Sequence, residues 1–390
     1  MPEYKYRILP VENDLEAVEN RKSCARANVG RAFLFLTIVV LTLLVIFVSI
    51  SDVSFDYGFD KIDLIALSED IRPIGSHIEE LWRAYKLPKV LTYNCNAFID
   101  NDNGVMEKYA KNGRIRLEKD VEVAMDCASI RRRVMGNNPY PKIRSFAIAR
   151  NVYESYALQE AFLSFSYHPD NSYCFALSKN ATSKFSKKIR RLEQCFPNIY
   201  LLNKTYEFDS AGHYQDIAHF GCLERLREKK QWSHVFFLQN DDLLLYTPEE
   251  ISEISKILGD ASGYYGGDEM LLSTLHSNTW LKIGGQPKIP CAFPDFVRWT
   301  HWNYESEKKC LSKKRRHGVC LVGVEYLNQL SKTNRLVANK VKMDFDFGAV
   351  MCVGEYLHKI STGARKRDID KNFYQNLPQV RQLHEKNFKC

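Results

Sequence analysis

The chain has 390 residues, of which 45% are hydrophobic and 26% are charged. This balance excludes a disordered or collagen-like chain, because neither carries enough apolar residues to build a core. The 55 Lys and Arg residues exceed the 47 Asp and Glu residues, which gives a formal net charge of +8. So small an excess does not indicate nucleic acid as a partner, but it suits a ligand that carries phosphate. The length allows two average domains or one large α/β domain.

An uncharged apolar run from Ala32 to Ile50 is the strongest local signal. As a helix it just spans the hydrocarbon core of a bilayer, which is about 30 Å thick. A cleaved signal peptide is the alternative, but it has a shorter apolar stretch and a small-residue cleavage site. Basic residues precede the run and acidic residues follow it, which predicts a single-pass type II protein. We expect a cytosolic tail over 1–31, a transmembrane anchor over 32–50 and a lumenal remainder.

The cysteines agree with this topology. Eleven are present, and all except Cys24 follow the anchor. An oxidising compartment favours disulfides, and the spacing of a zinc site, with two close Cys or His pairs, is absent. The triplets that begin at Asn180 and Asn203 are N-glycosylation sequons, which fit a lumenal chain but also arise by chance.

Residues 51–140 are polar and weakly patterned, and they predict an extended stem with some helix near 78–85. The pattern changes at residue 141, where a folded domain that runs to residue 390 is expected. Apolar runs predict strands over 143–149, 172–177, 198–202 and 233–239. Helical periods between them predict helices over 156–165, 184–194 and 211–229. This alternation is typical of βαβ units, so the fold class is α/β with a mostly parallel sheet flanked by helices.

Ligands of such sheets bind at the carboxyl ends of the strands. Polar residues expected there are Arg150-Asn151, Ser178-Lys179 and Asn240-Asp241-Asp242. The glycine motifs of dinucleotide-binding and phosphate loops are absent, and so is the hydrolase Gly-x-Ser-x-Gly motif. By analogy of architecture, a sugar-nucleotide-binding domain is expected. Asp241 and Asp242 have two interpretations, as metal ligands or as a strand-to-turn junction, and we favour the junction.

Inverting glycosyl transfer needs a carboxylate that accepts the proton of the attacking hydroxyl. Glu269 is our candidate; helix capping is the alternative for this residue. The departing diphosphate needs positive charge, for which Arg316 and Lys340 are candidates, although a solvated basic surface also explains them. Aromatic rings can hold sugar faces, and the group around Trp299 has either that role or a place in the core.

These residues resemble the core-2/I-branching β-1,6-N-acetylglucosaminyltransferase family, which is related to the peptide O-xylosyltransferases. The resemblance runs discontinuously from about Cys127 to the C-terminus. Its most specific stretch is 316–352, in which an Arg precedes Val-Cys-x-x-Gly and an Asn-Lys-x-x-x-Asp-x-Asp segment follows. The Tyr173-Cys174 and Asp268-Glu269 pairs also match. The resemblance implies a GT-A-like nucleotide-sugar-binding fold for the glycosyltransferase domain over 141–390, behind the transmembrane helix and stem.

The resemblance also implies roles for single residues. Glu269 becomes the catalytic base, Arg316 and Lys340 bind the donor diphosphate in place of a metal, and Trp299 contacts the acceptor. Four disulfides follow from it, with Cys291 and Cys390 left over: Cys95–Cys352, Cys127–Cys195, Cys174–Cys222 and Cys310–Cys320. No metal and no other cofactor is expected.

The expected function is therefore metal-independent, inverting transfer of a sugar from a UDP donor to an O-glycan or glycoprotein acceptor. By resemblance the sugar is N-acetylglucosamine, the product is a β-1,6 branch, and the place is the lumenal side of the Golgi membrane. The interval between Asp242 and Glu269 is shorter than in typical family members. A catalytically impaired lumenal relative that binds glycans or UDP is therefore the alternative, and a membrane-held scaffold without a ligand is a third interpretation.

Overall fold

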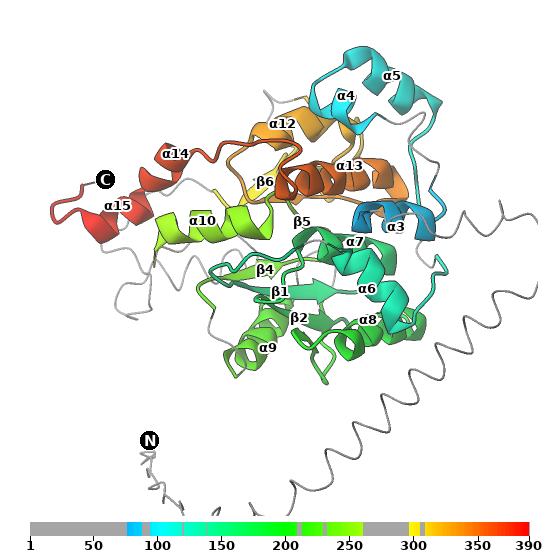
Figure 1. Ribbon diagram of the computed structural model, residues 1–390, viewed down its shortest axis with the longest axis horizontal. Coiled ribbons are helices and arrows are strands. Elements are labelled where there is room, and N and C mark those ends of the chain that lie inside the picture. Colours follow the sequence, from blue (N-terminus) through cyan, green and yellow to red (C-terminus); the bar gives the residue numbers. More distant parts are fainter. Residues whose placement is uncertain are drawn as a thin grey trace, which may run out of the picture. The chain divides into compact units, whose positions relative to one another are not determined.

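The computed structural model describes residues 76–87, 94–118, 121–137, 139–208, 213–228, 232–259, 296–304 and 309–389 (Figure 1). The predicted anchor over 32–50, the predicted base Glu269, and the two cysteines Cys291 and Cys390 lie outside these residues. Within the described ranges, no helix is both long and apolar enough to cross a membrane.

Four parallel strands form the central sheet in the order β3-β2-β1-β4. Their bounds are β1 Ala147–Val152, β2 Ser172–Leu177, β3 Ile199–Leu201 and β4 Val235–Leu238. The connecting helices are α7 Tyr156–Ser166, α8 Ser183–Cys195 and α9 Gln215–Arg227. The predicted α/β class with a parallel sheet and flanking helices is confirmed.

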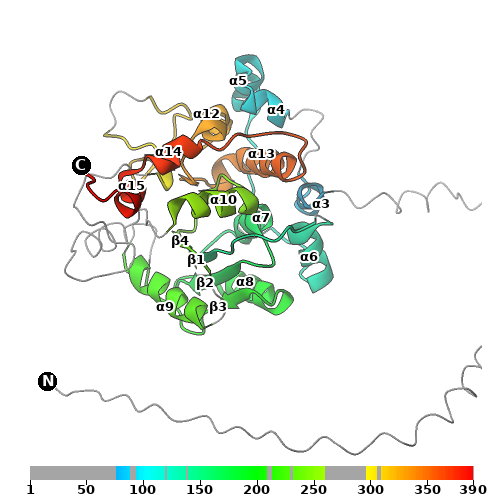
Figure 2. The same ribbon diagram turned by 60° about the vertical axis from the view of Figure 1, so that its left-hand side comes forward.

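The two faces of the sheet carry side chains of different size, because successive strand residues point to opposite faces. Ala147, Ala149 and Ala176 lie in a cluster with α9, and their small side chains allow that helix to approach closely. The larger Ile148 and Phe175 belong to the main core, which contains residues of α7 and α8. Figure 2 shows α9 on one side of the strands and α7 and α8 on the other.

The bounds of two predicted elements differ from the observed ones. The first strand begins at Ala147 rather than Ile143. In the residues just before Ala147, backbone amides donate to side chains and not to the backbone of a neighbouring strand. The amide of Arg144 donates to Ser252 Oγ over 2.8 Å, and the amide of Phe146 donates to Asn171 Oδ1 over 3.0 Å. The helix predicted over 211–229 begins at Gln215, directly after Tyr214, whose φ of 56° is left-handed and not helical.

A smaller sheet, a hairpin and several helices follow the central sheet. The smaller sheet has the order β5-β9-β6, in which β9 is antiparallel to β5 and parallel to β6. Its strands are β5 Leu243–Leu244, β6 Arg298–Thr300 and β9 Val337–Asn339, and the hairpin is β7 Arg315–Arg316 with β8 Val319–Cys320. The helices are α10 Pro248–Leu258, η3 Val324–Tyr326, α12 Leu327–Lys332, α13 Met343–Ser361, α14 Lys371–Gln375 and α15 Pro378–His384.

The predicted stem is not extended over the part that the structure describes. Residues 76–140 contain four helices, α3 His77–Ala84, α4 Cys95–Ile99, α5 Asn103–Asn112 and α6 Cys127–Met135. Buried side chains of these helices, including Leu81, Phe98 and Ile130, join the main core, and α3 and α4 contact α13. The folded domain therefore begins well before residue 141. The weak pattern has a physical reason, since short helices carry few turns of periodic signal.

All four disulfides that the resemblance implied are present. Cys95 and Cys352 join α4 to α13, and Cys127 and Cys195 join α6 to α8, each pair with Cα atoms 5.1 Å apart. The other two pairs are Cys174–Cys222, between β2 and α9, and Cys310–Cys320.

A buried ionic network holds the early helices to the sheet domain. The carboxylate of Glu160 on α7 accepts two hydrogen bonds of 2.8 Å from the Arg133 guanidinium on α6. It also accepts a bond of 2.8 Å from the Tyr156 hydroxyl and one from the Tyr85 hydroxyl at the end of α3. Burial, followed by the charge of Glu160, raises the pKa of Tyr85 well above its usual value, so this hydroxyl stays protonated and donates.

We expect the Glu160→Gln variant to lose about 3–5 kcal/mol of unfolding free energy, because it leaves the Arg133 charge buried without its partner. Denaturant unfolding measures this loss. Glu385→Gln removes one partner of an exposed pair with Arg381 and should not change the denaturation midpoint. Equal midpoints for Glu160→Gln and the unaltered protein would contradict the stabilising role of the network.

Candidate functional site

The turn between β4 and β5 carries the two adjacent carboxylates at the carboxyl edge of the sheet. Asp242 is fully buried and pairs with Arg298 Nη2 on β6 over 2.7 Å. It also accepts a hydrogen bond of 2.8 Å from Asn339 Nδ2 on β9. Asp241 pairs with Lys342 Nζ over 2.8 Å. The Asp242 carboxylate thus joins the turn to β6 and β9 of the smaller sheet.

These contacts favour the junction over the metal interpretation of Asp241 and Asp242. Each carboxylate already pairs with a buried cation. In the described part of the chain, no group of three or more His, Cys, Asp and Glu side chains is arranged to hold a metal ion. Arg150 completes the junction, since its guanidinium donates to the carbonyl oxygens of Gln239 and Asp242.

Lys340, predicted to bind diphosphate, follows β9 and lies next to this junction. Lys340 is buried, with only 7% of its surface exposed. Burial lowers its pKa, and the nearby Lys342 and Arg316 lower it further, while Asp241 and Asp242 act in the opposite direction. Among the described residues, Lys340 Nζ forms no hydrogen bond and no ion pair. A buried ammonium without a partner is unfavourable, and a bound anion removes the penalty.

Arg316, the second predicted cation, reaches the same region from the β7–β8 hairpin. It is exposed, and it is close enough to lower the pKa values of Lys340 and Tyr153. Its neighbour Arg315 acts instead on Tyr326, as expected for successive strand residues that point to opposite sides. Within the described residues Arg316 also has no ion-pair partner. The structure therefore brings Arg316 and Lys340 together, although they come from different elements.

Three further residues of this site are absent from the sequence analysis. Lys342 is 7% exposed and also bonds Glu154 Oε1 over 3.0 Å. Asp241 and Glu154 outweigh the effect of burial and raise the pKa of Lys342, so it stays charged. Burial and then Asp241 raise the pKa of Tyr153, which follows β1. Among the described residues, the cations Arg316, Lys340 and Lys342 lie near the carboxylates Asp241 and Glu154, while the nearby Asp242 is paired with Arg298. The Lys340-x-Lys342 spacing is the sequence signal that could have indicated Lys342.

Trp299, the predicted acceptor contact, is partly buried on β6. Its ring meets Tyr326 edge-on at 5.1 Å and packs against the main core. This position fits the core interpretation of the aromatic group, with one part of the ring left accessible. Trp302 and Tyr304 stack at 5.6 Å, and Tyr304 is 73% exposed, so this pair presents the larger open aromatic surface.

A pocket of about 720 Å³ lies where β2 ends. Lys179 and Asn180, which follow β2, line one side, and residues that precede α9 complete the lining: Glu207, Phe208, His213 and Tyr214. The predicted glycosylation residues Asn180 and Asn203 are both exposed. Because Asn180 lines the pocket, a glycan at this position would stand beside any ligand bound there.

The structure thus shows a parallel sheet covered by helices on both faces, and two cations near its carboxyl edge have no ion-pair partner among the described residues. The model of the Core-2/I-branching enzyme family matches residues 146–264. This match covers 119 of the 390 residues and supports the family resemblance over that segment. Arg316, Lys340 and Trp299 lie beyond the matched segment.

Several curated proteins align with the chain. The mouse (Mus musculus) beta-1,3-galactosyl-O-glycosyl-glycoprotein beta-1,6-N-acetylglucosaminyltransferase 3 is 24% identical over 213 residues, which cover 51% of this chain and 49% of that protein. The human (Homo sapiens) N-acetyllactosaminide beta-1,6-N-acetylglucosaminyl-transferase is 29% identical over 106 residues, 27% of this chain and 26% of that protein. The chain therefore spans about half, or less, of the length of the relatives it matches.

Proposed function

We propose that the protein is an inverting, metal-independent glycosyltransferase. It transfers a sugar, expected to be N-acetylglucosamine, from a UDP donor to an O-glycan or glycoprotein acceptor and forms a β-1,6 branch. The family match and the names of the aligned transferases support the type of reaction. The donor, the acceptor and the linkage are carried over from those relatives.

One observation carries the proposal: Lys340 and Arg316 lie close together at the carboxyl edge with no partner among the described residues. Two neighbouring cations without carboxylate partners in the described ranges match the charge of a nucleoside diphosphate. Lys342 supports them indirectly, because it pairs with Asp241 and so keeps that carboxylate from neutralising Lys340.

In the proposed reaction, the acceptor hydroxyl oxygen attacks the anomeric carbon of the donor sugar. The bond from that carbon to the diphosphate oxygen breaks, and the configuration inverts. Glu269 takes the hydroxyl proton, and UDP leaves with its new negative charge facing Arg316 and Lys340. The pocket at the end of β2 is the proposed place for the nucleoside, and Trp299 or the Trp302–Tyr304 stack is the proposed platform for the acceptor sugar.

The proposed location is the Golgi lumen, with the protein held as a single-pass type II membrane protein. The uncharged run over 32–50, its basic flank and the disulfides of the domain support this proposal.

The test of the proposed function is a transfer assay with the full-length protein. A panel of UDP-sugars is supplied with core-1 and lactosamine acceptors, and mass spectrometry identifies the products. We expect an added N-acetylhexosamine from UDP-N-acetylglucosamine. The absence of product from every donor would contradict the proposed activity.

Metal independence is tested in the same assay with a chelator. We expect EDTA to leave the transfer rate unchanged, because cations of the chain, not a metal ion, face the diphosphate. Inhibition by EDTA that manganese reverses would contradict this proposal and make Asp241 and Asp242 the candidate metal ligands.

A catalytically impaired UDP- or glycan-binding relative is the second candidate function. The short interval between Asp242 and Glu269 favours it, because typical family members carry additional sheet and acceptor-binding residues there. Calorimetry distinguishes the two candidates. Binding of UDP without transfer to any acceptor selects the impaired relative, while absence of UDP binding points to a scaffold without a ligand.

A further inference from the structure

A second cavity, of about 530 Å³, lies away from the predicted transfer site. It is lined by Pro139–Pro141, which precede β1, and by the end of α7, which precedes β2, so it lies near the amino ends of these parallel strands. Arg316 and Lys340 lie near the carboxyl ends. Its volume is within the range of about 300–1,000 Å³ that is usual for small-molecule sites.

Within the part of the chain that the structure describes, two buried polar atoms of this cavity have no hydrogen-bond partner. They are Oε2 of Glu249 on α10 and Nδ1 of His358 on α13. The cap of α10 does not need Glu249, because Thr247 and Glu250 form a reciprocal capping box. Burial lowers the pKa of His358, so its ring is neutral at physiological pH. Buried polar atoms of native proteins are almost always paired, so two unpaired atoms in one cavity indicate a missing partner.

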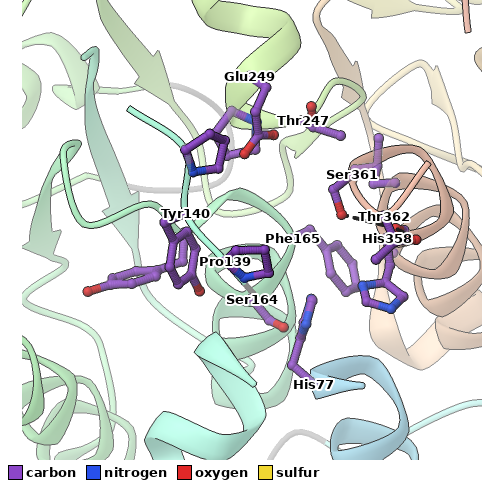
Figure 3. Close-up of a pocket in the computed structure, with 15 residues that line it drawn as sticks. His77, Pro139, Tyr140, Ser164, Phe165, Thr247, Glu249, His358, Ser361 and Thr362 are labelled. Carbon is purple, nitrogen blue, oxygen red and sulfur yellow. Dashed lines mark hydrogen bonds between the residues drawn. The ribbon is translucent and has the colours of Figure 1, made fainter. Parts of the chain in front are cut away.

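The remaining walls are largely apolar. Figure 3 shows Phe165 beside His358, with Ser361 and Thr362 also near the histidine, and Tyr140 on the far side of Pro139. Glu249 lies close enough to Tyr140 to contribute to the raised pKa of that hydroxyl, after burial and Tyr167. The cavity therefore combines aromatic surface with a hydrogen-bond acceptor at one side and an imidazole nitrogen at the other.

We propose that this cavity is a second binding site, which takes a neutral pyranose sugar. A carboxylate oxygen can only accept hydrogen bonds, and sugar hydroxyls donate them. A neutral imidazole nitrogen pairs with a further hydroxyl in either direction, and the C–H face of a sugar ring packs on an aromatic side chain. An anionic ligand is disfavoured by Glu249. The site is separate from the transfer site and does not depend on the transfer activity.

The test is ligand-observed NMR titration of the full-length protein with the methyl β-glycosides of galactose and N-acetylglucosamine. Saturating UDP is present to occupy the proposed donor site, and the cavity variants separate sugar binding at the cavity from sugar binding at the proposed acceptor platform. A desialylated O-glycopeptide forms a parallel arm, which distinguishes a free sugar from a glycan-borne one. Variants are Glu249→Ala and His358→Phe. Glu253→Ala is the matched control, because Glu253 lies on the same helix and pairs with Lys371 at the surface.

We expect at least one methyl glycoside to bind, and Glu249→Ala to weaken its binding roughly tenfold or more, the effect of losing a charge-assisted hydrogen bond. His358→Phe keeps the ring shape and should also weaken binding, while Glu253→Ala should not. Thermal unfolding shows which variants remain folded. One folded cavity variant, Glu249→Ala or His358→Phe, is enough to test the site. The proposal would be overturned if no glycoside binds, or if both cavity variants bind it as tightly as the unaltered protein does. Binding of tetramethylammonium instead of sugars would also overturn it. None of these results affects the proposed transfer function.

Discussion

The Glu269→Gln variant should lose about 10²- to 10⁴-fold in transfer rate and bind UDP as tightly as the unaltered protein. The amide keeps the size of the side chain but cannot accept the proton of the attacking hydroxyl. Single-turnover kinetics measures the rate, and calorimetry measures the affinity for UDP. The proposed role as catalytic base requires a lower transfer rate together with an unchanged affinity for UDP.

Asp268→Asn is the matched control for this prediction, because it neutralises the adjacent carboxylate in the same sequence context. We expect it to retain most of the transfer activity. If Asp268→Asn abolishes transfer while Glu269→Gln does not, the base has been assigned to the wrong member of the pair.

Replacing either Lys340 or Arg316 should produce the second large effect. We expect Lys340→Met and Arg316→Met each to lower kcat roughly 10²- to 10³-fold, the range found when one group that stabilises transition-state charge is removed. Arg315→Met is the control for the hairpin, because Arg315 faces Tyr326 and not Lys340. Loss of activity in Arg315→Met alone, with Arg316→Met active, would contradict the site geometry.

The lowered pKa of Lys340 adds a pH dependence to this second prediction. The charged ammonium binds the diphosphate, and a lowered pKa means that this charge is lost earlier as the pH rises. kcat/KM should therefore fall on the alkaline side before an ordinary lysine would titrate. An arginine keeps its charge throughout the pH range of the assay. In Lys340→Arg, the fall of kcat/KM at alkaline pH should therefore move to higher pH. An unchanged limb would assign the titration to another group.

The central sheet could be predicted from the sequence because its signals are local. The strand over Ser172–Leu177 and the helix that begins at Tyr156 match their predictions, since buried parallel strands read as short apolar runs. The exact start of β1 could not be predicted in this way. It depends on Ser252 and Asn171, which are distant in sequence and take the place of a strand partner.

The site could be predicted only in part. Arg316 and Lys340 were indicated by the family resemblance, and the structure brings them together. The junction interpretation of Asp241 and Asp242 agrees with the structure, but their partners Lys342 and Arg298 could not be predicted, because they lie far along the chain. The cavity with Glu249 and His358 left no sequence signal, since acidic residues in the first turn of a helix and a single helical His are both ordinary.

The helices over 76–140 set a limit on how the protein can be shortened. A recombinant fragment that begins at residue 141 would leave Cys195 and Cys352 as thiols without their partners Cys127 and Cys95. It would also lack Arg133, so the buried carboxylate of Glu160 would lose its ion-pair partner. Such a fragment would be prone to mispaired cross-links and aggregation during secretion, so a truncation that preserves the domain has to begin before Ser76.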